Sequence, residues 1–200
     1  MSQLRLATWQ MPSIVGHMII ELGHFCLILA FGLSCVQTVS GLVGAQYRWA
    51  GWMAVTGQAA LLQFALTACA FAALTHAFVT SDFSLRLVVL NSHSLKPMLY
   101  KISGVWGNHE GSLLLWVLIL TLFGALMASR LKRLTDGQST MSYALSVQGM
   151  IVIAFIGLIL FTSNPFARLT SLPDDGNGLN PILQDPGLAF HPPMLYLGYV

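Results

Sequence analysis

Near the end of the chain, a histidine stands at the start of an apolar segment, in the run FHPP over residues 190–193. A neutral imidazole is a common metal ligand, and it is a frequent axial ligand of haem iron. The following prolines lack backbone N–H groups and disfavour helical geometry just before them, so we expect His191 on a loop that enters a helix. A simpler alternative is an interfacial histidine that only caps a membrane helix.

A second candidate for chemistry is the run WGNHEGS over residues 106–112, which leads into an apolar segment. His109 beside Glu110 would form a hydrogen-bonded pair that tunes the imidazole, and Ser112 would cap the following helix. An aromatic belt with a capping turn explains Trp106 and Ser112 equally well. It does not explain the adjacent histidine and glutamate.

Two further places carry polar residues. His17, Glu21 and His24 are spaced to share one helix face, but we expect Glu21 to interact with a helix N-terminus rather than to bind metal. If Met18 is the true start, His17 does not exist. The turn-rich connector that includes FTSNPF over 161–166 and PDDGNG over 173–178 would lie flat on a membrane and form one wall of a binding surface.

The elements that must position these residues are membrane helices. The chain is 56% hydrophobic and only 8% charged, against about 25% charged residues in soluble domains. Each of four runs is long enough to cross a bilayer as a helix. They are Met18 to Ala45, Met53 to Val79, Gly111 to Ser129 and Met141 to Phe161. We therefore expect an all-α fold, a polytopic transmembrane helical bundle with periplasmic loops.

The expected organisation has three parts. Residues 1–17 form an N-terminal extension, and residues 18–187 hold the four spans with their loops. Residues 188–200 begin a fifth span that is cut off, so the chain reads as a fragment.

The distribution of basic residues predicts an orientation. Arg130, Lys132 and Arg133 form the densest basic cluster and should be cytoplasmic. The N-terminus, the segment 80–110 and the segment 162–187 then face the extracytoplasmic side. The basic residues in 80–110 are spread over a much longer stretch, so they weigh less.

Several function classes find no support in the sequence. Cys26, Cys35 and Cys69 lie in apolar runs, where free cysteine behaves as a small hydrophobic residue. No Cys-x-x-Cys-His run attaches haem to the chain itself. A net charge of only +2 does not indicate that the chain binds nucleic acid.

Four runs together resemble one family. WGNHEGSLLLW over 106–116, FTSNPF over 161–166 and LNPILQDPG over 179–187 running into FHPP are similar to the cytochrome c maturation protein F (CcmF) family of haem lyases. ELGH over 21–24 resembles the opening of that family. The resemblance extends from Met18 to Val200 and concerns the N-terminal portion of the family.

The resemblance implies a function in cytochrome c-type biogenesis. Members are multi-pass inner-membrane proteins that take haem from a periplasmic haem chaperone, alongside other cytochrome c maturation membrane subunits. They join the haem vinyl groups to the thiols of a Cys-x-x-Cys-His motif in apocytochrome c. The haem is a b-type haem until it is attached, and it is the substrate.

The same resemblance assigns residues. His191 matches the first of two periplasmic histidines that ligate the haem iron, while Trp106, His109 and Glu110 are candidates for the surrounding wall by location. The tryptophan-rich haem segment, the second periplasmic histidine and the ligands of a permanent b-type haem lie outside this chain. We therefore expect this fragment alone to be inactive as a thioether-forming lyase.

Three alternatives stay open at this stage. One is a paralogue dedicated to the haem of a nitrite reductase, and another is a scaffold subunit without a ligand of its own. The third is a polytopic transporter of haem or a small solute, although such proteins usually carry ionisable residues deep in their spans. Here the ionisable candidates gather at the extracytoplasmic ends.

Overall fold

The computed structural model describes residues 14–131, 136–171, 173–178, 180 and 184–200. These residues form α1 (Ile14–Tyr47), α2 (Ala50–Val79), α3 (Arg86–Asn91), α4 (Met98–Gly104), α5 (His109–Leu131), α6 (Gln138–Phe161) and α7 (Pro186–Tyr199). Their only pairing of the β type in this described part is an isolated bridge between Leu85 and Arg168. The all-α class predicted from the sequence is confirmed.

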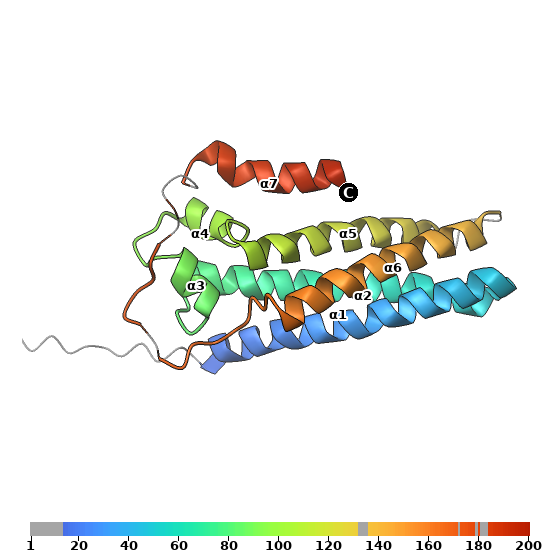
Figure 1. Cartoon of the computed structure of the whole chain (residues 1–200), viewed down its shortest axis with the longest axis horizontal. Helices are drawn as coiled ribbons and strands as arrows, with labels where there is room; N and C mark the ends of the chain where they lie inside the picture. Colours follow the sequence, from blue (N-terminus) through green and yellow to red (C-terminus); the bar gives the residue numbers. More distant parts are fainter. Residues whose placement is uncertain (1–13, 132–135, 172, 179, 181–183) are drawn as a thin grey trace, which may run out of the picture.

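Four of the helices, α1, α2, α5 and α6, are long and apolar enough to cross a membrane, as predicted. Even the shortest, α5, has 23 residues, a length of about 35 Å at helical rise. Figure 1 shows them side by side, with α1 packed on α2 and α6, and α5 packed on α2 and α6. Large apolar side chains such as Leu22, Phe25 and Leu62 stay exposed on the bundle. This is the architecture of a multi-pass membrane protein.

Glutamine side chains link three of the spans. Gln148 of α6 donates from Nε2 to the Leu120 carbonyl of α5 at 2.6 Å, and its Oε1 accepts from Gln37 Nε2 of α1 at 3.0 Å. Gly124 makes room for this contact, because a Cβ there would lie 2.2 Å from Gln148 Nε2. Small residues and interhelical amide bonds are the usual means by which helices associate in lipid.

One end of the bundle carries the structured segments between the spans, and we call it the loop end. Here α1 and α5 begin and α2 and α6 end, and α3, α4 and the described residues of the connector 162–185 lie beside them (Figure 1). Helices α3 and α4 lie within residues 80–110, for which the sequence predicts only one long segment between spans. Helix α7 starts at this end and runs back along α5.

Backbone hydrogen bonds tie the connector to the segment after α2. Arg86 N donates to the Ala167 carbonyl at 3.0 Å, and Leu169 N donates to the Ser84 carbonyl at 3.1 Å. An ion pair of 2.7 Å between Arg168 and Glu21 attaches the same strip to the beginning of α1.

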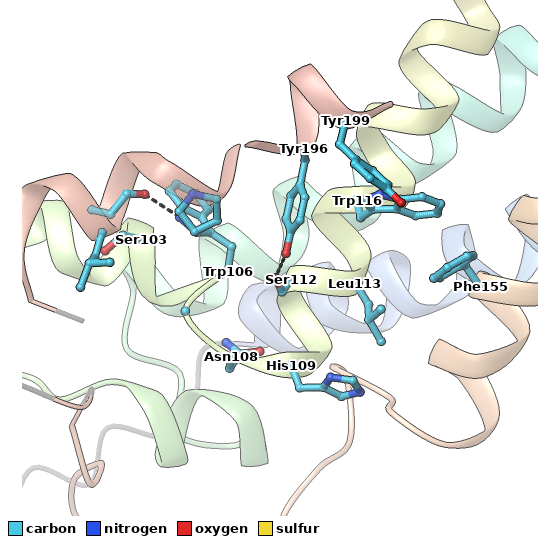
Figure 2. Close-up of a pocket in the computed structure, with 14 residues that line it drawn as sticks. Ser103, Trp106, Asn108, His109, Ser112, Leu113, Trp116, Phe155, Tyr196 and Tyr199 are labelled. Atoms are coloured by element: carbon cyan, nitrogen blue, oxygen red, sulfur yellow. Dashed lines mark hydrogen bonds between the residues drawn. The ribbon is translucent and has the colours of Figure 1, made fainter. Parts of the chain in front are cut away.

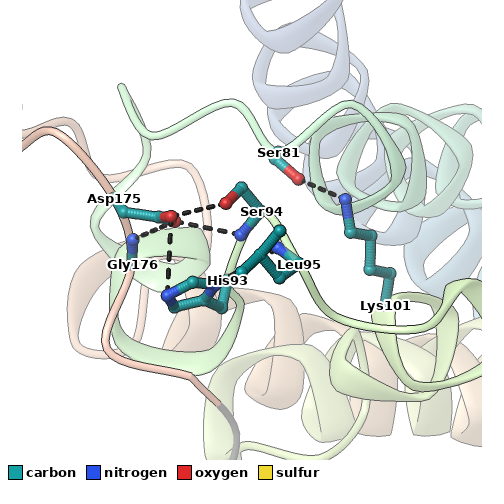
Figure 3. A network of polar contacts seen from close by, with 7 residues as sticks. All are labelled: Ser81, His93, Ser94, Leu95, Lys101, Asp175 and Gly176. Carbon is teal, nitrogen blue, oxygen red and sulfur yellow. Dashed lines mark hydrogen bonds and ion pairs between the residues drawn. The ribbon is translucent and has the colours of Figure 1, made fainter.

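Asp175 fixes the next part of the connector (Figure 3). Its carboxylate accepts hydrogen bonds from Ser94 N at 2.9 Å, from the Ser94 hydroxyl and from Gly176 N at 2.7 Å, and His93 Nε2 lies 3.5 Å away. Partial burial alone would raise the pKa of Asp175, but the hydrogen bonds from Ser94 and Gly176, together with nearby His93, lower it.

Candidate functional site between α5 and α7

The entrance of α5 is a tightly folded turn. Asn108 accepts a hydrogen bond from Gly111 N at 2.7 Å and donates from Nδ2 to the Gly104 carbonyl at 2.8 Å, so it caps α5 and ties the helix to α4. A Cβ at Gly111 would lie 1.7 Å from the Val105 carbonyl oxygen, so only glycine permits this approach. The turn holds Trp106 and His109 at fixed places.

Two expectations for this turn are wrong. The capping residue is Asn108 and not Ser112, because α5 begins at His109 and its third amide is that of Gly111. In this described segment no hydrogen bond joins His109 to Glu110, because successive helical residues point about 100° apart.

Helix α7 begins at a regular cap. Asp185 accepts a hydrogen bond from Leu188 N at 3.1 Å, and Pro186 occupies the first helical position. The helix then continues through Pro192 and Pro193 to Tyr199. His191 therefore lies inside a helix and not on the entry loop that the prolines predicted. Each proline removes one N–H donor from the interior of the helix, and at Pro193 the carbonyl that loses its helical partner, that of Ala189, accepts a hydrogen bond from Trp106 instead.

Two side-chain hydrogen bonds join α7 to α5. The Trp106 indole donates from Nε1 to the carbonyl of Ala189 at 2.8 Å. About two turns further along α7, the Tyr196 hydroxyl pairs with the Ser112 hydroxyl. Ala189 is buried in this contact with 3% exposure.

These contacts enclose an aromatic cleft of about 770 Å³ between the start of α5 and α7, which we call the α5–α7 cleft (Figure 2). Its walls include, among others, Trp106, Asn108, His109, Ser112, Trp116, Phe155, Pro192, Tyr196 and Tyr199. Its volume lies within the range of roughly 300–1,000 Å³ usual for cofactor and ligand sites. Aromatic walls with hydroxyl and amide groups suit a flat, mostly apolar molecule.

The structure brings together only part of the predicted set. Trp106 and His109 line the α5–α7 cleft, whereas Glu110 and His191 do not. Ala189, Pro192, Tyr196 and Tyr199 recur every three or four residues on the cleft side of α7. His191, two residues after Ala189, therefore faces away from the cleft and is exposed.

The polar residues of α1 have other partners. Glu21 pairs with Arg168, while His24 lies 3.2 Å from Asn164 Nδ2 and stacks on the Phe166 ring at 5.9 Å between centroids. The side chain of His17 lies outside the described part. Among the described residues, no group of three His, Cys, Asp or Glu side chains could hold a metal ion.

None of the described residues of the connector lines the α5–α7 cleft. Those between 162 and 180 pack on α1 and on the segment from Ser84 to Ser94, as the contacts of Arg168 and Asp175 illustrate. The predicted wall for a binding surface comes instead from α7.

Sequence reasoning missed Tyr196 and Asn108. Tyr196 stands seven residues after Ala189, a spacing that returns to the same helix face, but the expected loop at His191 hid this periodicity. Asn108 stands three residues before Gly111, which is the capping spacing and was available as a signal.

Known proteins are similar to this chain both in the region of the cleft and over most of its length. A family model described as "Cytochrome C assembly protein" matches residues 106–200, which include both walls of the α5–α7 cleft. The chain is 63% identical over 183 residues to "Cytochrome c-type biogenesis protein ccl1" of Rhodobacter capsulatus, covering 92% of this chain and 28% of that protein. It is 50% identical over 187 residues to "Cytochrome c-type biogenesis protein CcmF" of Pseudomonas aeruginosa, again covering 92% and 28%.

A solved structure has the same fold. The structure named "Cytochrome c Heme Lyase CcmF" matches with a TM-score of 0.74 at 24% identity, over 90% of this chain and 28% of that chain. The chain thus spans about 28% of the length of the relatives that it matches. On these sequence matches, which run through the turn before α5 and through α7, it belongs to the CcmF family of cytochrome c-type biogenesis proteins.

Proposed function

We propose that this chain is part of a cytochrome c haem lyase, which accepts haem at the extracytoplasmic membrane surface and attaches it to the Cys-x-x-Cys-His motif of apocytochrome c. The observation that carries the proposal is 63% identity, over 92% of the chain, to a protein named for cytochrome c-type biogenesis. The exposed histidine and the aromatic cleft at the loop end are compatible with haem handling.

His191 is the proposed axial ligand of the substrate haem iron. It is exposed on α7, and its backbone is held in a regular helix, so the imidazole has a defined direction from the bundle. An imidazole ligand would hold the iron while the edge of the porphyrin meets the cysteine thiols. The haem would then sit outside the α5–α7 cleft, on the exposed side of α7.

Trp106, His109 and Glu110 have different proposed roles. Trp106 supports the α7 backbone through its indole N–H, and His109 lines the cleft behind α7. Glu110 neighbours His109 at the first turn of α5, where a carboxylate interacts favourably with the helix N-terminus. None of the three needs to touch iron in this arrangement.

The proposed location is the bacterial inner membrane, with the loop end periplasmic. The opposite end bears Arg48 between α1 and α2 and Arg130 in the last turn of α5, and Lys132 and Arg133 follow Arg130 in the sequence. The positive-inside rule assigns this basic cluster to the cytoplasm. The proposed partners are a periplasmic haem chaperone, apocytochrome c and other membrane subunits of cytochrome c maturation. Exposed apolar residues of α7, such as Phe190 and Met194, would face lipid or other parts of the assembly.

Covalent haem staining tests the proposal. In cells whose only copy of the complete coding sequence carries His191→Ala, we expect the stain of c-type cytochromes to disappear while the protein still accumulates in membranes. His93→Ala is the matched control, because His93 is a partly exposed loop-end histidine that pairs with Asp175 and lies on no helix of the cleft. Full staining in the His191→Ala cells would remove His191 from the mechanism.

A further inference from the structure

Pro193 leaves one carbonyl of α7 without its usual partner. In an α-helix the N–H of residue i bonds to the carbonyl four residues earlier, so residue 193 would normally donate to Ala189. Proline has no N–H, and the Ala189 carbonyl therefore needs another donor.

Trp106, which lies in the turn between α4 and α5, supplies that donor. Its indole Nε1 lies 2.8 Å from the Ala189 oxygen. Ala189 is only 3% exposed, so water has little access to replace the indole. A buried polar group without a partner is unfavourable, which makes this hydrogen bond specific to one rotation of α7.

That rotation also sets the direction of His191. Ala189 faces the bundle, and His191, two residues later on the helix, faces the opposite side. The Ser112–Tyr196 contact fixes the same face of α7 further along. The two contacts together hold α7 against turning about its axis or sliding along α5.

We propose that Trp106 is a positioning residue for the haem ligand. By replacing the N–H that Pro193 lacks, it fixes the turn of α7 that carries His191, and it does so without touching haem. This inference rests on the proposed role of His191 as ligand.

A set of variants separates positioning from general structure. Trp106→Phe keeps an aromatic ring and removes the N–H. Pro193→Ala returns an N–H to the Ala189 carbonyl, so the double variant W106F/P193A should regain the wild-type behaviour. Pro192→Ala is the matched control, because its new N–H would serve the Leu188 carbonyl instead and should not rescue W106F.

The first readout needs no haem. Hydrogen–deuterium exchange of the α7 peptide, measured on the complete protein in detergent, should be about two- to tenfold faster in W106F, the range expected for loss of one hydrogen bond. Exchange should return to the wild-type rate in W106F/P193A and stay fast in W106F/P192A. Unchanged exchange in W106F, or equal rescue by both proline variants, would overturn the proposal.

The second readout is the absorption difference spectrum on titration with haemin, with His191→Ala as the reference for lost ligation. W106F should bind haemin about two- to tenfold more weakly in the His191-dependent spectral component, and P193A should restore it. Faster exchange with an unchanged His191-dependent spectrum would overturn positioning. A wild-type spectrum in His191→Ala would instead overturn the ligand role, and with it the proposed function of His191, while leaving the α7 contact intact.

Discussion

Lys96 is a basic side chain buried at the loop end, with 9% exposure. Its Nζ donates to the Asn91 carbonyl at 2.9 Å, and it lies close to Gly104, where a Cβ would come within 3.1 Å of it. Burial, and secondarily the charge of Lys101, lower the pKa of Lys96 to about 8. The folded state therefore disfavours the charged form of this residue.

This predicts that stability rises with pH. Because the pKa is lower in the folded state, the unfolded chain binds more protons between about pH 8 and the ordinary lysine value of 10.5. Lys96→Met should be more stable than wild type by on the order of 1–3 kcal/mol at pH 7, with the difference closing as the pH approaches 10.5. Thermal unfolding in detergent across this range would test it. If the melting temperatures of the two proteins changed with pH in parallel, the lowered pKa of Lys96 would be contradicted.

At the scale of elements, the part of the connector around Asp175 is held by one carboxylate with several donors, in addition to backbone hydrogen bonds of Asn177 and Gly178. Asp175→Asn keeps the shape but weakens the hydrogen bonds from the two Ser94 donors and removes the charge beside His93. We expect residues 173–178 to be cleaved severalfold faster in limited proteolysis, with α1 to α6 still intact. Asp174→Asn, at an exposed neighbouring position, is the control. Equal cleavage of the two variants would show that Asp175 does not hold the connector.

The elements also show where sequence reasoning succeeds and where it stops. The four spans can be predicted because each apolar run is long enough to cross a bilayer. This signal is local and does not depend on contacts between distant residues. Helices α3 and α4 are only six and seven residues long, too short to show a clear helical periodicity in the sequence. Helix α3 is held by hydrogen bonds to the connector, and α4 packs against α2 and α7.

At the candidate site the local signal was misleading. The two prolines predicted a loop at His191, but a carbonyl freed by proline is satisfied by Trp106 from 83 residues earlier in the chain. A hydrogen bond at that sequence separation cannot be read from the local sequence. The Ser112–Tyr196 pair, which borders the α5–α7 cleft, could not be predicted for the same reason, because its two residues are 84 positions apart in the chain.

At the scale of the whole molecule, the bundle has two chemically different ends. Arg48, between α1 and α2, and Arg130, in the last turn of α5, lie at one end, whereas the loop end holds α3, α4, the described residues of the connector and the start of α7. Positive charge in short connections favours retention in the cytoplasm.

This asymmetry predicts a labelling pattern. Asp174→Cys should react with a membrane-impermeant thiol reagent in spheroplasts, and Asp136→Cys should react only after the membrane is opened, because both positions are exposed but lie at opposite ends. Cys26, Cys35 and Cys69 lie within spans and give the background, which the unsubstituted protein measures. The reverse pattern would invert the proposed orientation.

The ion pair between Glu21 and Arg168 bears on how the protein is made. Its two partners are separated by 147 residues, the difference between positions 168 and 21. At about 5–20 residues per second, a ribosome needs roughly 7–30 s to supply the second partner after the first. During that interval the beginning of α1 lacks this partner. The Glu21–Arg168 contact, and with it this closure of the loop end, can form only after the fourth span has been synthesised.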